Sequence, residues 1–352
     1  MRLVVNVTSF APGYDDEDVF LRNLLDAMRN VQPDTRFVLL TDELSHDSYE
    51  GWERIFVGRP APGTSAESGP TEKSIERAIQ LAQAELVFSP LQTALEVPTQ
   101  LLVPIVFDVG FLGSNSRLSQ WRNLSIHREA RRICSHLNVV IAPSEHIRQQ
   151  LLNLLGVAMN KVVVAQPGAN PAYDKSYPSI AEEPFLIALS DTRHRDLNGL
   201  LAKAFQRLEA EMSHYLVVTG REIENEPEDW GSRVLRVLSC PPSNLAGLLQ
   251  HSTAYVCTSC HEGAAINVLS AMRAGARIIA PRVGGIAEIA STCAIYYNHE
   301  SIGSLMSAIK RALTEDKSER AGNIEYGKKR STEFTWERCA WRTLNALKRV
   351  GA

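Results

Sequence analysis

The stretch CTSCHEGAAINVLSAMRAG, residues 257–275, joins two short apolar runs, and its pattern determines the fold class. The run AYVCTS (254–259) overlaps its beginning and RIIAP (277–281) follows it, and both runs are typical of buried strands. Between them, CHEG predicts a turn and AAINVLSAMRAG predicts a helix that ends at Gly275. A strand, a helix and a second strand of these lengths form a right-handed βαβ unit, so we expect the two strands to be parallel.

The same alternation of strand-sized runs and amphipathic segments extends over almost the whole chain. In the first half, six runs predict strands: RLVVNVTS, RFVLLTD, ELVFSP, LLVPIVFDV, NVVIAPS and KVVVAQP. Residues 170–184 contain three prolines without periodicity and predict a linker, after which the alternation restarts. We therefore predict an α/β protein with two Rossmann-like parallel-sheet domains, residues 1–172 and 173–352, facing a central cleft. Ligands of such sheets bind beyond the carboxyl ends of the strands.

Composition argues against several classes of protein. The 352 residues include 37 Lys and Arg against 40 Asp and Glu, a balance that argues against a nucleic-acid-binding protein. The apolar runs are too short to span a membrane, and the N-terminus lacks the pattern of a signal peptide. The six cysteines are scattered and do not resemble a secreted disulfide framework. We therefore expect a reduced, cytoplasmic protein.

Cys257, Cys260 and His261 match the C-x-x-C-H pattern of covalent haem attachment. That attachment requires export, for which the sequence carries no signal. A structural zinc ion requires four ligands, and this motif supplies too few. We therefore expect neither zinc nor haem here, and we interpret Cys257 as a buried residue of an apolar strand.

Small residues open two helices at the same edge of the second predicted sheet. Gly263, Ala264 and Ala265 precede one helix, and Gly284 and Gly285 precede the next. Such residues let a ligand approach the free N–H groups of a helix start, which favour anions. The two neighbouring turns therefore suit a diphosphate, although tight turns alone would also explain the glycines.

Charged residues at predicted strand ends are further candidates. Arg193 and Arg195 follow the first strand of the second domain, and their forked guanidinium groups suit phosphate, although a solvated loop has the same composition. Glu262 would repel a phosphate but could hold the neutral hydroxyls of a sugar, or only stabilise the helix start. Asp108 ends a buried strand of the first domain as a candidate acid, base or hydroxyl acceptor.

Two charged segments of the first domain have alternative interpretations. The acids at 15–18 could form a D-x-D metal motif, or they could stabilise the first turn of a helix. The arginine-rich segment 117–132 fits a peripheral contact with an anionic lipid surface or acceptor, or a solvated helix face.

Taken in order, these motifs resemble glycosyltransferase family 4, the retaining, group-1-type glycosyl transferases of GT-B fold. The family signature reads roughly S-x-x-E-G-F-G-L-P-x-L-E-A-M-A-x-G-x-P-V-I, followed by G-G-x-P-E. The positions that match it are Ser259, Glu262, Gly263, Leu269, Ala271, Met272, Gly275, Gly284, Gly285 and Glu288. The resemblance spans nearly the whole chain, and FTWERCAWRTLNAL resembles the terminal helix (about 336–350) that crosses back to the N-terminal domain. The sequence departs from the family at several positions: AAIN (264–267) replaces its Phe-Gly-Leu-Pro turn, Ser270 replaces its second glutamate, and Phe107 replaces the histidine before Asp108. The glycine-rich loop after the family's first strand is also replaced, by SFAPGYDDEDV.

The resemblance implies transfer of a sugar, with retention, from a nucleotide-sugar donor to a glycan, lipid-linked or other hydroxyl acceptor. It implies that Glu262 holds donor hydroxyls and that Asp108 lies near the acceptor. Ser270, eight residues after Glu262 and on the same side of the predicted helix, would contact the ribose weakly. The predicted donor-binding residues are Arg193, Arg195, Gly263, Ala264, Ala265, Ser270, Gly284 and Gly285.

No metal or other cofactor is expected, because helix starts and arginines can stabilise a leaving diphosphate. The departures from the signature leave two alternatives open: an inactive relative that acts as a partner or regulator, and a nucleotide-sugar epimerase of the same fold.

Overall fold

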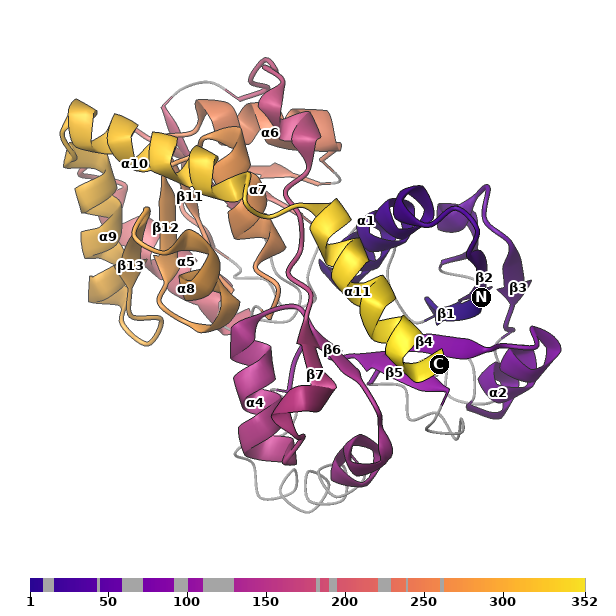
Figure 1. Ribbon diagram of the computed structural model, residues 1–352. Coiled ribbons are helices and arrows are strands. Elements are labelled where there is room, and N and C mark those ends of the chain that lie inside the picture. Colours follow the sequence, from indigo (N-terminus) through magenta and orange to yellow (C-terminus); the bar gives the residue numbers. More distant parts are fainter. Residues whose placement is uncertain are drawn as a thin grey trace. The chain divides into compact units, whose positions relative to one another are not determined.

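A computed structural model gives the arrangement of the chain (Figure 1). The structure describes residues 1–8, 16–42, 45–58, 72–91, 101–109, 130–181, 184–189, 195–220, 229–238, 240–259 and 263–351. The chain divides into two compact units: unit 1 is Met1–Pro167 with Trp336–Ala352, and unit 2 is Gly168–Thr335. Each unit contains one parallel sheet with helices, which confirms the predicted fold class.

Within the described residues, unit 1 is built on a seven-stranded sheet of order β3-β2-β1-β4-β5-β6-β7, in which all neighbours are parallel. The strands are β1 (Arg2–Asn6), β2 (Arg36–Thr41), β3 (Arg54–Phe56), β4 (Leu86–Pro90), β5 (Leu102–Ile105), β6 (Val140–Ala142) and β7 (Val162–Val164). Successive side chains point to opposite faces, so Val4 belongs to one core while Leu3 and Val5, equally buried, face the other side. Both faces of this sheet are therefore covered.

The helices of unit 1 include α1 (Asp16–Val31), α2 (Glu72–Leu81), α4 (Glu145–Leu155) and α11 (Trp336–Gly351), with short 3-10 turns η1 (His46–Tyr49) and η3 (Met159–Lys161). Residues 130–136 are helical as well. Ser144 caps α4 as its sequence predicts, because Ser144 Oγ accepts a hydrogen bond from the Ile147 N–H at 3.2 Å. The predicted apolar stripe of α4, including Ile147, Leu151 and Leu155, is buried against the sheet.

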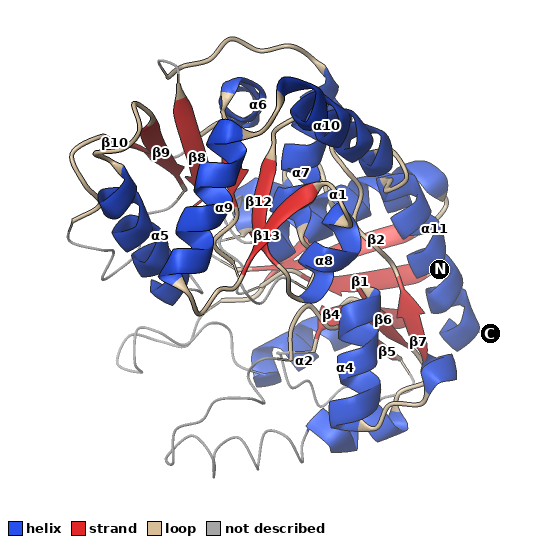
Figure 2. Cartoon of the chain, turned by 90° about the vertical axis from the view of Figure 1, so that its left-hand side faces the viewer, coloured by secondary structure: helices blue, strands red, loops and turns tan. Residues whose placement is uncertain are grey.

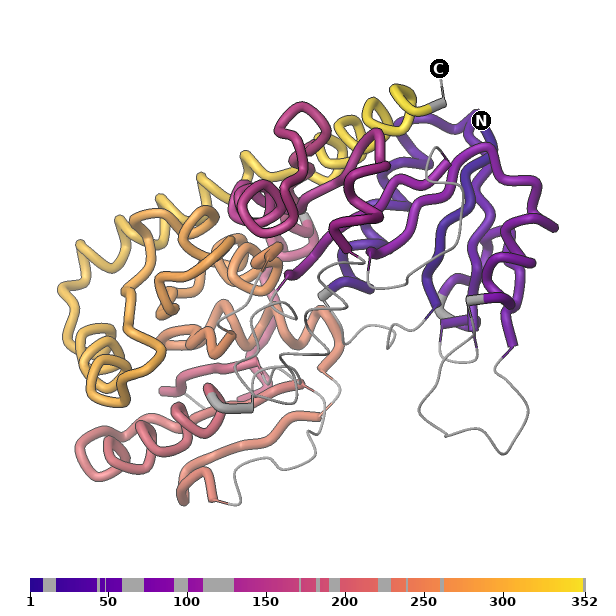
Figure 3. Tube along the Cα trace, turned by 90° about the horizontal axis from the view of Figure 1, so that it is seen from below, coloured from indigo at the N-terminus to yellow at the C-terminus, as the bar shows by residue number. Residues whose placement is uncertain are grey.

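An aromatic cluster fixes the start of α11 within unit 1. The ring of Phe20 in α1 lies 5.3 Å from that of Trp336 and 5.1 Å from that of Phe107, nearly perpendicular to both. This edge-to-face geometry is favourable for aromatic pairs. Further along the helix, Arg342 donates a hydrogen bond to Val164 O of β7 at 2.9 Å. Both ends of the chain therefore belong to unit 1 (Figures 1 and 3).

Unit 2 contains, in its described part, a six-stranded parallel sheet of order β10-β9-β8-β11-β12-β13. The strands are β8 (Phe185–Leu189), β9 (Tyr215–Thr219), β10 (Val234–Val237), β11 (Ala254–Val256), β12 (Ile278–Pro281) and β13 (Ala294–Tyr297). The helices are α5 (Arg195–Leu208), α6 (Pro242–His251), α7 (Ile266–Ala274), α8 (Gly284–Ala290), α9 (Ile302–Thr314) and α10 (Lys317–Ser331), with the 3-10 turn η4 (Pro171–Asp174).

Alternate residues of β8 enter the two cores of unit 2. Phe185 and Ile187 pack with residues of α6, α7 and α8, whereas Leu186 and Ala188 pack with residues of α5 and α9. The sheet therefore separates two helical layers, as expected for parallel strands (Figure 2).

The first part of the predicted linker is held against unit 2. Ala169 N donates to Phe334 O at 3.0 Å, and Tyr177 N donates to the Gln250 side chain of α6 at 3.0 Å. Gln250 in turn donates to Lys175 O at 2.6 Å. The backbone groups of this segment are therefore hydrogen-bonded to the protein, whereas in a flexible linker they would be hydrogen-bonded to water.

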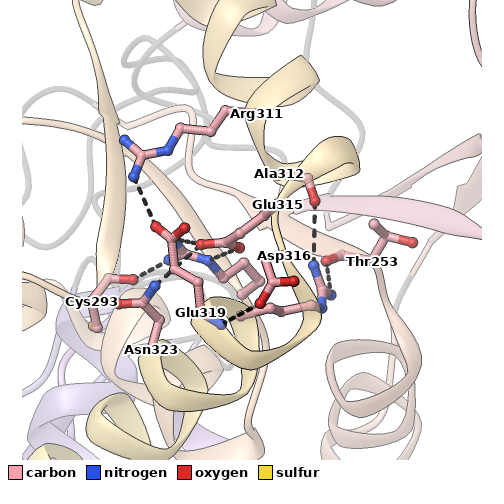
Figure 4. A network of polar contacts seen from close by, with 10 residues as sticks. Thr253, Cys293, Arg311, Ala312, Glu315, Asp316, Glu319 and Asn323 are labelled. Carbon is pink, nitrogen blue, oxygen red and sulfur yellow. Dashed lines mark hydrogen bonds and ion pairs between the residues drawn. The ribbon is translucent and has the colours of Figure 1, made fainter.

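A buried ion pair connects the start of β12 to the junction of α9 and α10 (Figure 4). The guanidinium group of Arg277 donates to both oxygens of Glu315 at 2.7 and 2.8 Å, and Asn323 donates to Glu315 at 3.1 Å. Arg277 also donates to Cys293 O. The Arg277 guanidinium holds the pKa of the Glu315 carboxyl below its ordinary value. Both carboxylate oxygens of Glu315 thus accept hydrogen bonds, which a buried charge requires.

Three local expectations differ from the structure. The short edge strand β3, which lacks alternation, was not predicted from the sequence. The helix predicted from Ala264 begins only at Ile266, because Ala265 has φ 51° and is left-handed. The helix after β8 begins at Arg195, earlier than its apolar pattern indicates. Among the described helices, none is long and apolar enough to cross a membrane.

Candidate functional site

The strand order of unit 2 places a candidate site at the carboxyl ends of β8 and β11. After β8 the chain adds β9 and β10 on one side and then continues with β11 on the other side. Such a reversal leaves the loops after the two central strands on opposite faces and opens a crevice between them. The segments after β8, β11 and β12, together with the first residues of the helices that follow them, carry all the predicted donor-binding residues except Ser270.

Directly after β11, three residues remain buried at this edge of the sheet. Cys257 N continues the ladder by donating to Ile279 O at 2.8 Å, and Thr258 Oγ1 donates to Leu189 O at the end of β8 at 3.3 Å. Ser259 is only 4% exposed, and its hydroxyl has no hydrogen-bond partner among the described residues. A buried hydroxyl without a partner is unfavourable, so Ser259 is a natural contact for a polar ligand group.

The start of α7 leaves backbone N–H groups without a side-chain cap. Gly263 and Ala264 are buried, and the left-handed Ala265 precedes the first helical residue, Ile266. Because the helix starts only at Ile266, Glu262 is not part of it. The expectation that Glu262 and Ser270 share one side of a helix is therefore wrong. Glu262 itself lies outside the described residues.

The start of α8 is the second helix end at this edge. Gly284 and Gly285 are its first two residues, and Gly284 has φ 48°. Val283 precedes them and provides no side-chain cap. Since β11 and β12 are neighbouring parallel strands, the starts of α7 and α8 lie at the same edge of the sheet. Together they offer N–H groups to an anion.

The predicted arginines lie at the loop after β8. Arg195 is the first residue of α5, and Arg193 falls in the segment 190–194 outside the described residues. The backbone places Arg195 beyond the carboxyl end of β8, which is next to β11.

Comparison with known proteins matches this edge of unit 2 to one family. Residues 183–315, which include β8, α5, β11, α7, β12 and α8, match the family described as glycosyl transferases group 1. Unit 2 therefore contains a region that is similar to group 1 glycosyl transferases. The resemblance stated from the sequence is therefore confirmed, and the matched region contains all the predicted donor-binding residues.

Individual relatives agree with this assignment. O-antigen chain mannosyltransferase B of Escherichia coli is 22% identical over an alignment that covers 60% of this chain and 60% of that enzyme. Among solved structures, HepE of Anabaena in complex with UDP-glucose is similar with a TM-score of 0.78 and 14% identity, over 99% of this chain and 100% of that one. Sucrose-phosphate synthase of Thermosynechococcus elongatus gives 0.76 and 15% identity, over 99% and 98% of the two chains. These likenesses show that the chain has the GT-B fold.

In the matched region of unit 2, Ser270 contacts a residue that was not predicted as part of the site. The Ser270 hydroxyl of α7 is hydrogen-bonded to the hydroxyl of Tyr173 in η4. One turn further, Arg273 Nε donates to Asp174 Oδ1 at 2.5 Å. Burial raises the pKa of Tyr173 to about 12, so its hydroxyl keeps its proton at neutral pH. Tyr173 was overlooked because the surrounding NPAYD sequence is typical of a loop.

In unit 1, Phe107 and Asp108 follow β5 and differ sharply in environment. Phe107 is buried beside Phe20, so the position that replaces the family's histidine belongs to the core. Asp108 is half-buried and engaged in a polar interaction.

A buried polar pair at the ends of β1 and β4 was not predicted from the sequence. There, Asn6 donates to Ser89 Oγ at 3.2 Å. A polar residue inside each of two apolar strands was the available signal.

The other predicted candidates have these environments. Cys257 is buried, and Cys260 and His261 lie outside the described residues. Asp18 of the acidic segment is buried and paired with Arg22 at 2.7 Å, and Tyr49 donates to it at 3.1 Å. The described parts of the chain contain no group of three His, Cys, Asp or Glu side chains that could hold a metal ion. Of the arginine-rich segment, only residues 130–132 are described.

Proposed function

We propose that the chain transfers a sugar from a nucleotide-sugar donor to a hydroxyl acceptor, with retention of the anomeric configuration. The observation that carries this proposal is the strand reversal at β8 and β11 within the region that is similar to group 1 glycosyl transferases. That edge carries two helix starts without a side-chain cap and the buried Ser259 hydroxyl, which has no partner in the described part of the chain. This combination suits a ligand with both phosphates and sugar hydroxyls.

On the donor side, the diphosphate would lie at the starts of α7 and α8, with Arg193 and Arg195 beside it. When the sugar–phosphate bond breaks, negative charge develops on the leaving diphosphate. Fixed N–H dipoles and guanidinium groups stabilise that charge without reorganisation, so no metal ion or other cofactor is required. Ser259 and Glu262 would then hold the sugar hydroxyls. These hydroxyls are neutral, whereas the phosphates would repel the Glu262 carboxylate.

On the acceptor side, Asp108 would lie near the attacking hydroxyl. The half-buried position of Asp108 and its place after a central strand of unit 1 support this role. Because a mannosyltransferase of O-antigen chains is among the relatives, we further propose a hexose donor and a glycan or lipid-linked acceptor. We expect this transfer to take place in the cytoplasm.

Turnover of a panel of nucleotide sugars tests the proposal. The panel should include UDP-glucose and a nucleotide-activated mannose, with thermal shift as the binding readout and release of nucleoside diphosphate as the activity readout. We expect at least one nucleotide sugar to raise the melting temperature and to be hydrolysed slowly without acceptor. Interconversion of the sugar while still attached to the nucleotide would favour an epimerase.

A further inference from the structure

The outward side of α11 carries cations and an exposed tryptophan. The helix buries Cys339, Leu344 and Leu347 in unit 1. Its other side presents six residues at intervals of three or four, here called the α11 stripe: Arg338, Trp341, Arg342, Asn345, Lys348 and Arg349. Residues at this spacing are neighbours along one side of a helix. Trp341 is 62% exposed, which is unusual for so large an apolar side chain.

The charge of the α11 stripe is strongly one-sided. Four of its residues are basic, and Glu337 is the only acid of the helix. This contrasts with the whole chain, whose net charge is −3. Lys348 and Arg349 form no ion pair within the described residues, so their charges are available to a partner. Charge complementarity therefore favours an anionic partner.

An open groove runs beside the exposed tryptophan. It has a volume of about 350 Å³ and lies between α11 and β7, the edge strand of the sheet. Its walls are formed by Val163, Trp341, Arg342, Asn345, Ala346 and Arg349. One nitrogen of the Arg342 guanidinium is fixed by Val164 O, which holds that cation at the groove. The groove thus combines an indole, an amide and two guanidinium groups.

We infer that the α11 stripe is a docking surface for a membrane that contains anionic phospholipids. Tryptophan is enriched at the headgroup level of a bilayer, where its apolar ring can contact lipid while its N–H group contacts water. Lysine and arginine beside it are attracted to the negative surface of such membranes. The residues from Arg338 to Arg349 extend over about 16 Å of helix, which is more than one lipid headgroup covers. A single soluble anion would account for two of the cations but not for the exposed indole.

The experiment measures co-sedimentation of the full chain with vesicles. One set contains phosphatidylcholine alone and a second set contains phosphatidylcholine with about one third phosphatidylglycerol. We expect binding to the anionic set, weakened by salt because surface charges are screened. Trp341→Ala should lower the partition coefficient about tenfold by removing apolar contact. The double variant Lys348→Gln with Arg349→Gln should lower it about twenty-fivefold, since each cation contributes roughly fivefold.

The matched control lies on α10 of unit 2. Tyr326→Ala with Lys329→Gln also removes an exposed aromatic ring and a cation, but acids are interspersed along that helix. This control should bind vesicles like the wild type. Circular dichroism melts check that every variant is folded, which is expected because none of these side chains belongs to the core.

Several outcomes would overturn the inference. Equal binding to neutral and anionic vesicles, or the absence of vesicle binding, would do so. Wild-type binding by the Trp341→Ala and Lys348→Gln/Arg349→Gln variants would place the contact elsewhere on the chain. If soluble glycerophosphate or inorganic phosphate displaced the protein from vesicles at millimolar concentration, the groove would be a site for a free phosphate compound and not a membrane surface. None of these outcomes depends on glycosyl transfer.

Discussion

The hydroxyl of Tyr173 is hydrogen-bonded to that of Ser270, so η4 is joined to α7 at the position where the family signature has its second glutamate. Arg273 and Asp174 form an ion pair beside it. These two contacts link a segment that follows unit 1 in the chain to a helix at the candidate donor site. Position 270, where the family signature has a glutamate, is thus occupied by a serine that makes a polar contact within unit 2.

Removal of the Tyr173 hydroxyl should cost little stability. Tyr173→Phe keeps the buried ring and deletes one neutral hydrogen bond, so we expect the free energy of unfolding to fall by about 1 kcal/mol. Ser270→Ala should have a similar effect. Because both variants remove the same bond, the double variant should lose less than the sum, which urea unfolding can measure. Fully additive losses would show that the two hydroxyls do not interact.

Restoration of the acid at position 270 should strengthen donor binding. A glutamate reaches further than a serine and forms charged hydrogen bonds to neutral hydroxyls, so Ser270→Glu should tighten binding of the cognate nucleotide about ten- to thirtyfold. Calorimetry measures the affinity, and Ser270→Gln is the control that has the length without the charge. An affinity unchanged or weakened in Ser270→Glu would remove this position from the nucleotide site.

The arginines after β8 should bind the diphosphate. Arg193→Ala and Arg195→Ala should each weaken nucleoside-diphosphate binding by about 10- to 150-fold, the range for a charge-assisted hydrogen bond. Arg207→Ala is the matched control, because Arg207 is exposed in the last turn of the same helix as Arg195. Calorimetry that gave all three variants the wild-type affinity would exclude both arginines from the site.

The buried pair of Arg277 and Glu315 should make unit 2 sensitive to acid. The pKa of Glu315 is depressed by Arg277, so its stabilisation is complete above the unfolded value of about 4.3. The stabilisation is lost as the pH falls through the lower folded value. Glu315→Gln should cost about 3 kcal/mol near neutral pH, because Arg277 would stay buried without a counter-ion. It should also reduce the loss of stability below pH 4.3.

Glu319→Gln is the control for this measurement, because Glu319 pairs with Arg311 at the exposed surface. Its effect should stay within about 0.5 kcal/mol. Denaturant unfolding at several pH values compares the two variants. Similar losses in both would show that burial of the Arg277–Glu315 pair does not matter for stability.

The sequence predicted the elements that have a strong pattern and failed where tertiary contacts decide. The buried strands of both sheets and the Ser144 cap follow from local apolar runs and a local hydrogen bond. The start of α7 was placed two residues too early, because the left-handed backbone of Ala265 leaves no mark in an alanine-rich sequence. The Tyr173–Ser270 contact joins residues far apart in the chain, so no local pattern could reveal it.

The site was predicted from the order of motifs along the chain more than from hydrophobic periodicity. Gly284 and Gly285 could be predicted as part of it because they are paired glycines between a predicted strand and a predicted helix. Phe107 was noted only as a departure from a family pattern, and its packing against Phe20 could not be read from the neighbouring residues.

Release of nucleoside diphosphate by the wild type and by Glu262→Gln, with nucleotide binding measured on the same samples, tests the central claim most directly. We predict that the wild type turns over at least one nucleotide sugar. The variant should bind the nucleoside diphosphate equally well but lose most of the turnover, because Glu262 is proposed to contact the sugar and not the phosphates. If the wild type neither binds nor turns over any nucleotide sugar at millimolar concentration, the account is contradicted, and a non-catalytic partner or regulator would replace it.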